Sequence, residues 1–137
     1  MSRTARSLRR LAFVTALFGA VTMSFAADDD FELAEALYRR GYLDLAEEKF
    51  NELIAQKGDR QGDGEFGLAL LKRYEAMKDA GETAEKRRKP YDVVMKEFED
   101  ADGVFAGFIK DNASHKRALD AKLERARLLQ ERAKYQL

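Results

Sequence analysis

The sequence contains no cysteine and no tryptophan, and it has one proline and one histidine. Without cysteine the chain forms no disulfide and offers no thiolate nucleophile. A zinc site needs three or four protein ligands, so one histidine without cysteine argues against a metal centre. After residue 26 the chain has one serine, Ser114, and one threonine, Thr83. Ser114 and His115 are adjacent and fit a helix start better than a nucleophile beside its base. We therefore expect no catalytic residues, no metal and no cofactor.

Long hydrophobic runs are also scarce, and the one that exists lies near the N-terminus. The segment 11–23 is apolar and follows four arginines in residues 1–10, and Ser24, Phe25 and Ala26 come next. About 13 apolar residues suit a signal peptide and are too few for a membrane span. The pattern predicts a signal peptide over 1–26, cleaved after Ala26, and an exported, periplasmic or extracellular bacterial protein. The alternative is an uncleaved, membrane-anchoring tail.

The charges exclude one class of partner. The whole chain balances 25 cationic against 25 anionic side chains, and loss of the four N-terminal arginines leaves 21 against 25. A mildly acidic protein is a poor candidate for binding nucleic acid. A basic cluster at 86–89 is interpreted as a solvated helix face or tip, with an anionic partner or a membrane surface as the alternative.

Helical periodicity is the dominant pattern after residue 30, and no stretch alternates as a strand does. A first helix carries Leu33, Ala34, Leu37 and Tyr38 on one face and stops at Gly41. Asp44 and Glu47 have the spacing of a capping box that opens a second helix. The apolar face of this second helix comprises Leu45, Ala46, Phe50, Leu53 and Ile54.

The stretch 56–64, QKGDRQGDG, has no apolar residue and is predicted to be a loop. Asp59 and Asp63 match the first half of a calcium-binding EF-hand loop. However, Leu70 occupies the position of the bidentate glutamate, so we expect no calcium site.

Three further helical segments follow the loop. The run 65–79 has a seam of Phe66, Leu70, Tyr74 and Met77. Pro90 opens a longer run in which apolar residues alternate by three and four: Tyr91, Val94, Phe98, Ala101, Phe105 and Phe108. Gly103 and Gly107 lie within this run and are predicted to be points of close packing. A last helix, capped by Ser114, has the apolar stripe Ala118, Leu119, Leu123, Ala126, Leu129 and Ala133. Its polar outer face is Lys116, Arg117, Asp120, Glu124, Arg127 and Glu131.

The first hairpin resembles the tetratricopeptide repeat (TPR), through Ala34, Leu37, Gly41, Ala46 and Phe50. The resemblance implies an all-α fold of about five helices, in which antiparallel hairpins stack as a short solenoid over residues 27–137. The hairpins would span about 30–56 and 65–111, and the last helix about 115–135. It further implies a protein-interaction scaffold that binds a peptide or helix on its first helices. The surface residues carried over are Phe31, Glu35, Tyr38, Arg39, Leu68, Leu71 and Lys72.

The alternative function is a self-associating helical bundle or coiled coil of the cell envelope, joined through the seam 91–108. An open seam favours that alternative, and a seam closed by the helix 65–79 favours the scaffold. We also expect a weak homodimer through residues 115–137, because Leu128, Tyr135 and Leu137 add apolar surface there.

Overall fold

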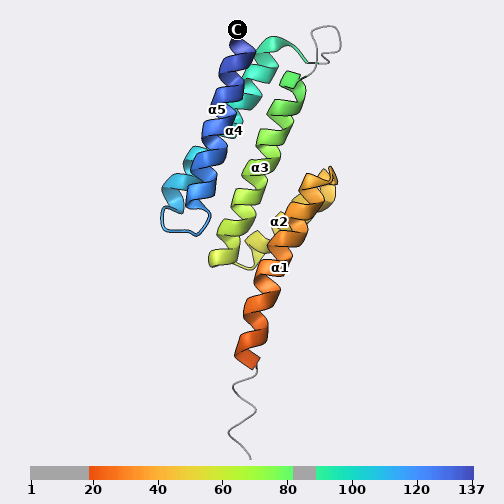
Figure 1. The fold of residues 1–137 in the computed structure, drawn as a ribbon, viewed down its shortest axis with the longest axis vertical. Helices are drawn as coiled ribbons and strands as arrows, with labels where there is room; N and C mark the ends of the chain where they lie inside the picture. The colour runs from red at the N-terminus through yellow and green to blue at the C-terminus, as the bar shows by residue number, and fades with distance from the viewer. Residues whose placement is uncertain (1–18, 82–88) are drawn as a thin grey trace, which may run out of the picture.

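The computed structural model describes residues 19–81 and 89–137. These residues form five helices and no strand: α1 (Gly19–Arg39), α2 (Leu43–Ala55), α3 (Asp59–Gly81), α4 (Tyr91–Asp111) and α5 (Ala118–Gln136) (Figure 1). The predicted all-α class with about five helices is confirmed. The N-terminal part of the predicted signal peptide, residues 1–18, and the basic residues 86–88 lie outside the described residues.

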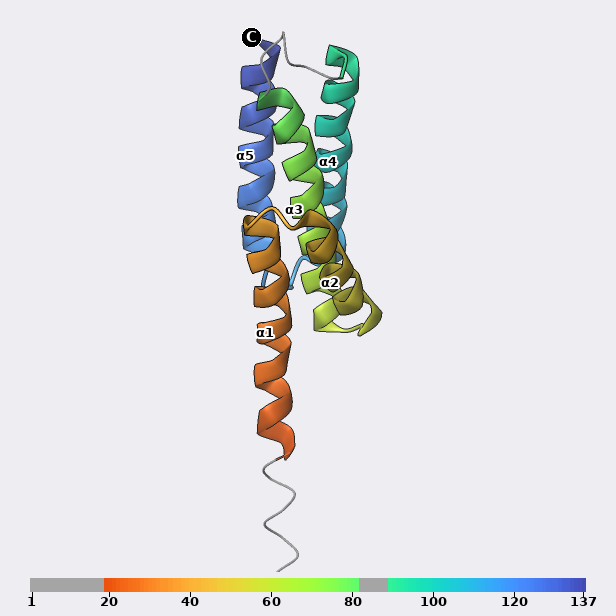
Figure 2. The ribbon, with the colours of Figure 1, turned by 90° about the vertical axis from the view of Figure 1, so that its right-hand side faces the viewer.

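The helices form a short solenoid of two stacked hairpins and a final helix. Each helix packs against the next in the chain, and α1 and α5 also pack against α3. Of the described helices, α3 alone contacts the other four. In Figure 2, α1 and α5 lie on one side of α3, and α2 and α4 lie on the other. The first helices of the hairpins and the final helix therefore share one face of the molecule. None of the described helices is long and apolar enough to cross a membrane.

Gly41 ends the first helix, as predicted. Its φ of 82° is left-handed, and the amides of Gly41 and Tyr42 donate hydrogen bonds to the carbonyls of Tyr38 and Leu37. The predicted capping box is wrong, because Tyr42 is the N-cap of α2 and makes no side-chain cap hydrogen bond. Asp44 lies in the first turn, where its charge complements the positive end of the helix.

The prediction of a loop over 56–64 is wrong for most of its length. Only Lys57 and Gly58 take left-handed φ angles there, and α3 already begins at Asp59. Three glycines of α3, Gly62, Gly64 and Gly67, pack against neighbouring segments. A Cβ on Gly64 would lie 2.4 Å from the Phe50 carbonyl oxygen, and one on Gly67 would lie 2.1 Å from the Phe50 ring. The helix α3 thus uses glycine where α2 approaches it most closely.

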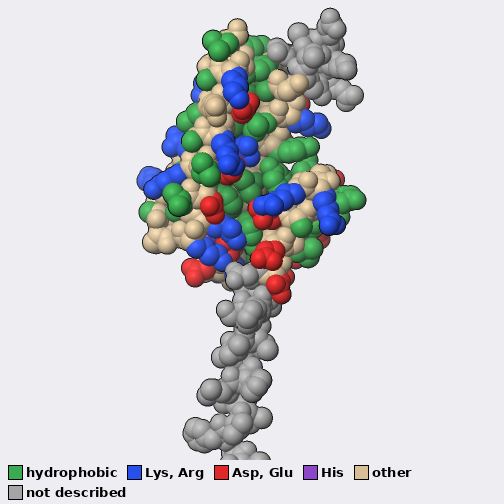
Figure 3. Space-filling model, viewed as in Figure 1, with side chains coloured by type: hydrophobic (Ala, Val, Ile, Leu, Met, Phe, Trp, Pro, Cys, Tyr) green, Lys and Arg blue, Asp and Glu red, His purple; other side chains and the backbone are tan. Residues whose placement is uncertain are grey.

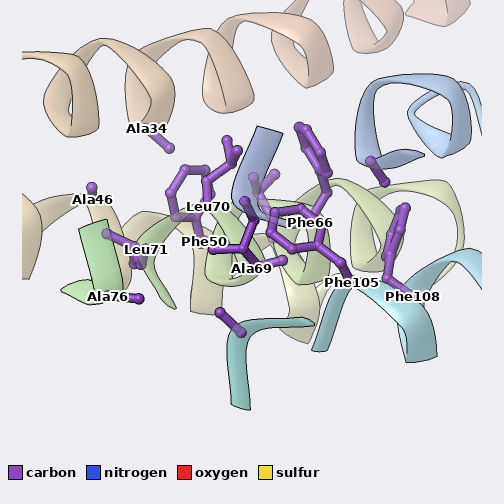
Figure 4. Packing of buried hydrophobic residues seen from close by; sticks show 14 of the residues in the cluster. Ala34, Ala46, Phe50, Phe66, Ala69, Leu70, Leu71, Ala76, Phe105 and Phe108 are labelled. Carbon is purple, nitrogen blue, oxygen red and sulfur yellow. The ribbon is translucent and has the colours of Figure 1, made fainter. Parts of the chain in front are cut away.

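A chain of aromatic rings runs through the core (Figure 4). Phe31 and Phe50 have ring centroids 5.8 Å apart, Phe31 and Phe66 6.3 Å, and Phe66 and Phe108 5.9 Å. Phe50 is fully buried, as its repeat position predicts. These contacts connect α1, α2, α3 and α4, so one hydrophobic core spans both hairpins.

The long seam of α4 faces inward. Val94, Phe98, Ala101, Phe105 and Phe108 are buried, and α3 and α5 pack against α4. Tyr91 is half-exposed and stacks on Tyr135 of α5, with ring centroids 5.3 Å apart. The predicted close packing at Gly103 and Gly107 is wrong, because a Cβ on either would meet nothing within 4 Å.

The last helix buries a face that differs from the predicted one and shares only Ala118 with it. Leu119 is 76% exposed and Leu123 51%, whereas Leu128 is 0% exposed. Leu128 therefore belongs to the core and cannot add to an exposed apolar surface. The predicted Ser114 cap is also wrong, because α5 begins at Ala118 and Arg117 is its N-cap.

Ion pairs fix this orientation of α5. Arg125 binds Asp102 through Nε and a terminal nitrogen, at 2.6 and 3.1 Å, and Arg132 binds Glu99 at 2.9 Å. Both acids belong to α4, so these pairs hold the two helices together along their length.

Lys89, the last residue of the basic cluster, joins α3 to α4. Its ammonium group bonds the carboxylates of Asp79 at 2.7 Å and of Glu97. These two hydrogen bonds raise the pKa of Lys89. The solvated helix tip predicted for this cluster therefore does not describe Lys89, which is tied to two neighbouring helices.

Candidate interaction surface

The candidate site is the face that α1, α3 and α5 share, here called the first-helix surface. Five partly exposed or half-buried residues define it: Tyr38, Arg73, Tyr74, Arg117 and Glu124. Figure 3 views this side and shows hydrophobic side chains in the hollow between α1 and α3, with charged side chains along its borders. The surface therefore combines an apolar floor with charged margins.

Arg117 organises one end of the first-helix surface. Its Nε donates to the buried Asp63 carboxylate at 2.7 Å, and its guanidinium carbon lies 3.5 Å from the centroid of the Phe31 ring. Lys116 adds a second cation 3.3 Å from Asp63. The Asp63 charge is thus buried with partners, which a carboxylate in a hydrophobic setting requires. This cluster ties together α1, α3 and the segment that leads into α5.

His115 lies beside this cluster and serves the fold. Its Nδ1 accepts a hydrogen bond from the Arg117 amide at 3.2 Å, so Nε2 carries the proton and donates to the Asp59 carbonyl, 2.9 Å away. A Cβ on Gly62 would lie 2.7 Å from the imidazole ring. The ring nitrogens are both engaged, which leaves His115 no free position for proton transfer to a substrate.

Tyrosine and charged side chains occupy the middle of the first-helix surface. Tyr38 of α1 and Tyr74 of α3 meet edge to face, with ring centroids 5.9 Å apart. Arg73 of α3 forms an ion pair with Glu124 of α5 at 2.8 Å. Burial raises the pKa of Tyr38, and the nearby Arg73 partly opposes that shift. Three helices therefore contribute side chains to one small area.

An open cavity of about 380 Å³ lies at the other end of the same face, between the C-terminal parts of α3 and α5. Its lining comprises Met77, Ala80, Gly81, Glu131, Lys134, Tyr135 and Leu137. The size suits a few side chains of a bound segment.

Of the four surface residues predicted on the first hairpin, the structure places three at or beside the first-helix surface and one in the core. Tyr38 is half-buried on the first-helix surface, and Glu35 and Arg39 form an ion pair of 2.9 Å beside it. Phe31 is only 1% exposed, and its ring forms part of the core. Its predicted place on an open surface is wrong, because the ring is covered by Arg117 and packed against Phe66.

The residues predicted on the second hairpin lie on other faces of α3. Leu71 is buried, and Lys72 is exposed but pairs with Glu75 at 3.1 Å. The prediction matched Gly67 to Ala34, but Gly67 packs against the Phe50 ring of α2, and the residues of α3 that meet α1 and α5 are Tyr74 and Arg73. Lys72 lies two positions before Tyr74, about 200° away around the helix, so it points away from α1. Leu68 lies four positions before Lys72 and shares its side of the helix.

Arg73, Tyr74, Glu124 and the Asp63–Arg117 pair were not predicted as part of this surface. The sequence did contain one useful signal. Gly64, Gly67 and Leu71 are spaced by three and four, which extends the helical period backward into the supposed loop.

No cluster of potential metal ligands occurs within residues 19–81 and 89–137. No protein-family model, curated protein or solved structure matches the chain.

Proposed function

We propose that this chain is an exported, TPR-like interaction scaffold that binds a peptide or helix of another protein on its first-helix surface. The observation that carries the proposal is the convergence of Tyr38, Tyr74, Arg73 and Glu124 from three helices on one face. Tyrosine and arginine are enriched in the parts of interfaces that contribute most binding energy. The charged pair beside the tyrosines would set the register of a bound segment.

The covered seam of α4 also supports the scaffold over the coiled-coil alternative. Val94, Phe98 and Phe105 are fully buried within the monomer, so they offer no stripe to another copy. We assign no catalytic role. His115 is held by backbone groups, and Ser114 is an exposed turn residue that makes no cap on α5.

Site-specific photo-crosslinking tests the proposed surface. A benzophenone amino acid at position 38 should capture a partner in the producing cell, whereas the same probe at position 104, exposed on the outer side of α4, should not. Crosslinks from position 104 alone would place the partner on the second helices and contradict the proposal.

The captured partner then allows a quantitative comparison. Tyr38→Ala combined with Arg39→Ala should weaken binding at least tenfold, with helical circular dichroism unchanged. Val104→Ala combined with Lys110→Ala is the matched control on α4 and should bind as the unmodified chain does. Equal affinity of both double variants would remove the first-helix surface as the binding site.

A further inference from the structure

The exposed side of α5 carries an apolar stripe that nothing in the described structure covers. Leu119, Leu123, Ala126 and Leu129 are exposed there, as is Leu137 at the chain end. These positions recur at helical spacing, so they lie along the outer side of one helix. An apolar stripe of this extent on a surface helix is typical of an interaction site.

Basic residues border this stripe. Helical geometry places Lys122 on one side of it and Lys134 on the other, and both side chains are exposed. Residues 115–137 contain seven Lys or Arg against three Asp or Glu, and three of the seven, Arg117, Arg125 and Arg132, bind acids of α3 and α4. This stripe with its basic borders is called the α5 edge.

The opposite edge of the molecule has the complementary character. Leu33 on α1 and Leu45 on α2 are about half-exposed, and residues 29–56 contain eight Asp or Glu against three Lys or Arg. Leu45 shares one helix face with Glu48 and Glu52, because the spacings are three and four. Lys49 donates hydrogen bonds to the Glu52 carboxylate at 2.7 and 2.9 Å, and this contact, with the charges of Glu48 and Asp30, raises the pKa of Lys49. Acids of both helices therefore lie in one region. This acidic surface with two leucines is called the α1–α2 edge.

We propose that the α5 edge of one copy binds the α1–α2 edge of a second copy, so that chains associate head to tail. Exposed leucines would meet leucines at the centre, and the basic borders of one edge would face the acids of the other. Seen facing the first-helix surface, as in Figure 1, α5 lies to the left of α3 and α1 to the right, so both edges of one chain can be occupied at once. Contacts between unlike surfaces of this kind build open chains of copies or closed rings rather than symmetric dimers.

A symmetric dimer through α5 fits the same observations less well. In an antiparallel α5 pair, the register that brings Leu119 onto Leu137 also brings Lys122 onto Lys134 of the other copy. Like charges are then opposed twice, and such contacts weaken association. Head-to-tail binding avoids this repulsion, and it leaves the first-helix surface open, so it is independent of the scaffold function.

Charge reversal on each edge tests the proposal. Sedimentation velocity of the full chain, across a wide concentration range and at low and high salt, should show species larger than dimers that dissociate as salt increases. Glu48→Lys with Glu52→Lys should weaken this association at least tenfold, and so should Lys122→Glu with Lys134→Glu. Lys96→Glu with Lys110→Glu, on the outer side of α4, is the matched control and should leave it unchanged.

Mixing the two edge variants gives the decisive result. Glu48→Lys with Glu52→Lys places like charges against the basic borders of the α5 edge, and Lys122→Glu with Lys134→Glu places like charges against the acids of the α1–α2 edge, so each variant opposes its own association. Contacts between the two variants instead pair opposite charges at these positions. An equimolar mixture should therefore recover the association of the unmodified chain. A strict monomer at every concentration would overturn the proposal. So would a dimer that ignores the α2 substitutions, which would indicate α5 pairing, or a mixture that stays dissociated.

Discussion

At the scale of single residues, glycine in this chain serves two different purposes that the sequence alone does not separate. Gly67 lies in the interior of α3 and touches the Phe50 ring, whereas Gly103 lies in the interior of α4 and faces open space. Both reduce helix propensity by about 1 kcal/mol relative to alanine. Only at Gly67 does the missing side chain permit a tertiary contact.

Alanine substitution should therefore act with opposite sign at these two positions. Gly67→Ala should lower the free energy of unfolding by about 1–3 kcal/mol, because the added methyl group overlaps the Phe50 ring. Gly103→Ala should raise it by up to about 1 kcal/mol, because the methyl group meets nothing and the helix becomes stiffer. Urea unfolding followed by circular dichroism measures both changes.

Phe50→Ala provides the internal control for this comparison. Phe50→Ala alone should lower the free energy of unfolding by about 3–5 kcal/mol, because it empties a fully buried site between two helices. In that background Gly67→Ala should no longer destabilise, since the ring with which it overlaps is gone. Stabilisation by Gly67→Ala in the unmodified chain would contradict the close approach of α2 and α3.

At the scale of helices, α5 shows why an apolar pattern can select the wrong face. Its exposed side carries Leu119, Leu123 and Leu129, whereas its buried side has Ala118, Ala121 and Leu128. Arg125 and Arg132 complete the buried side, and their aliphatic stems cover apolar surface while their charged ends bind acids of α4. Counting apolar residues favours the outer side. The ion-pair partners that decide the orientation are more than twenty residues away in the sequence.

The contact between α1 and α3 predicts a specific alkaline titration. Burial raises the pKa of Tyr38 above that of a free phenol, about 10, so the unfolded chain loses this proton at lower pH than the folded chain does. The share of stability linked to Tyr38 is therefore present below pH 10 and is lost as the pH rises through the folded-state pKa. Tyr38→Phe should reduce the loss of stability above about pH 10.

Spectrophotometric titration of tyrosinate provides the direct measurement. The spectrum of the folded unmodified chain should contain a late-ionising phenol that disappears in Tyr38→Phe. Tyr42→Phe, which removes an exposed phenol at the hairpin turn, is the reference variant. If the late-ionising phenol persists in Tyr38→Phe, Tyr38 is not buried against Tyr74.

At the scale of the whole molecule, the sequence predicts the fold class and the buried residues better than it predicts which face each helix turns to its neighbours. The Gly41 turn and the buried Ala34, Ala46, Phe50 and α4 seam follow from local periodicity, and the structure confirms them. The spacing of Gly64, Gly67 and Leu71 carries a local signal for the early start of α3, whereas the orientation of α5 depends on ion pairs with α4 that no local pattern encodes. The same holds for the first-helix surface, because Tyr74 and Arg73 of α3 are identified by their partners on α1 and α5 rather than by their spacing.

The last prediction concerns the removal of residues 1–26 by cleavage after Ala26 during export. Residues 19–26 belong to α1, but the first buried side chain that the structure describes is Phe31, which contacts Phe50 and Phe66. Cleavage would therefore shorten α1 at its N-terminus and leave every described core contact in place. We expect the processed chain to melt at the same temperature as the full chain, within the error of the measurement.

Mass spectrometry of the protein recovered from the bacterial periplasm or medium would test this processing. The mature chain should begin at Ala27 or Asp28, because Ser24 and Ala26 supply the small residues that signal peptidase recognises. Ala26→Arg should block cleavage and leave the precursor attached to the membrane, with its helical content retained. A secreted protein that still begins at Met1 or Ser2 would show that residues 1–26 are not a signal peptide. The net charge of the mature chain would then remain balanced rather than becoming acidic, and the argument against nucleic acid would lose its basis.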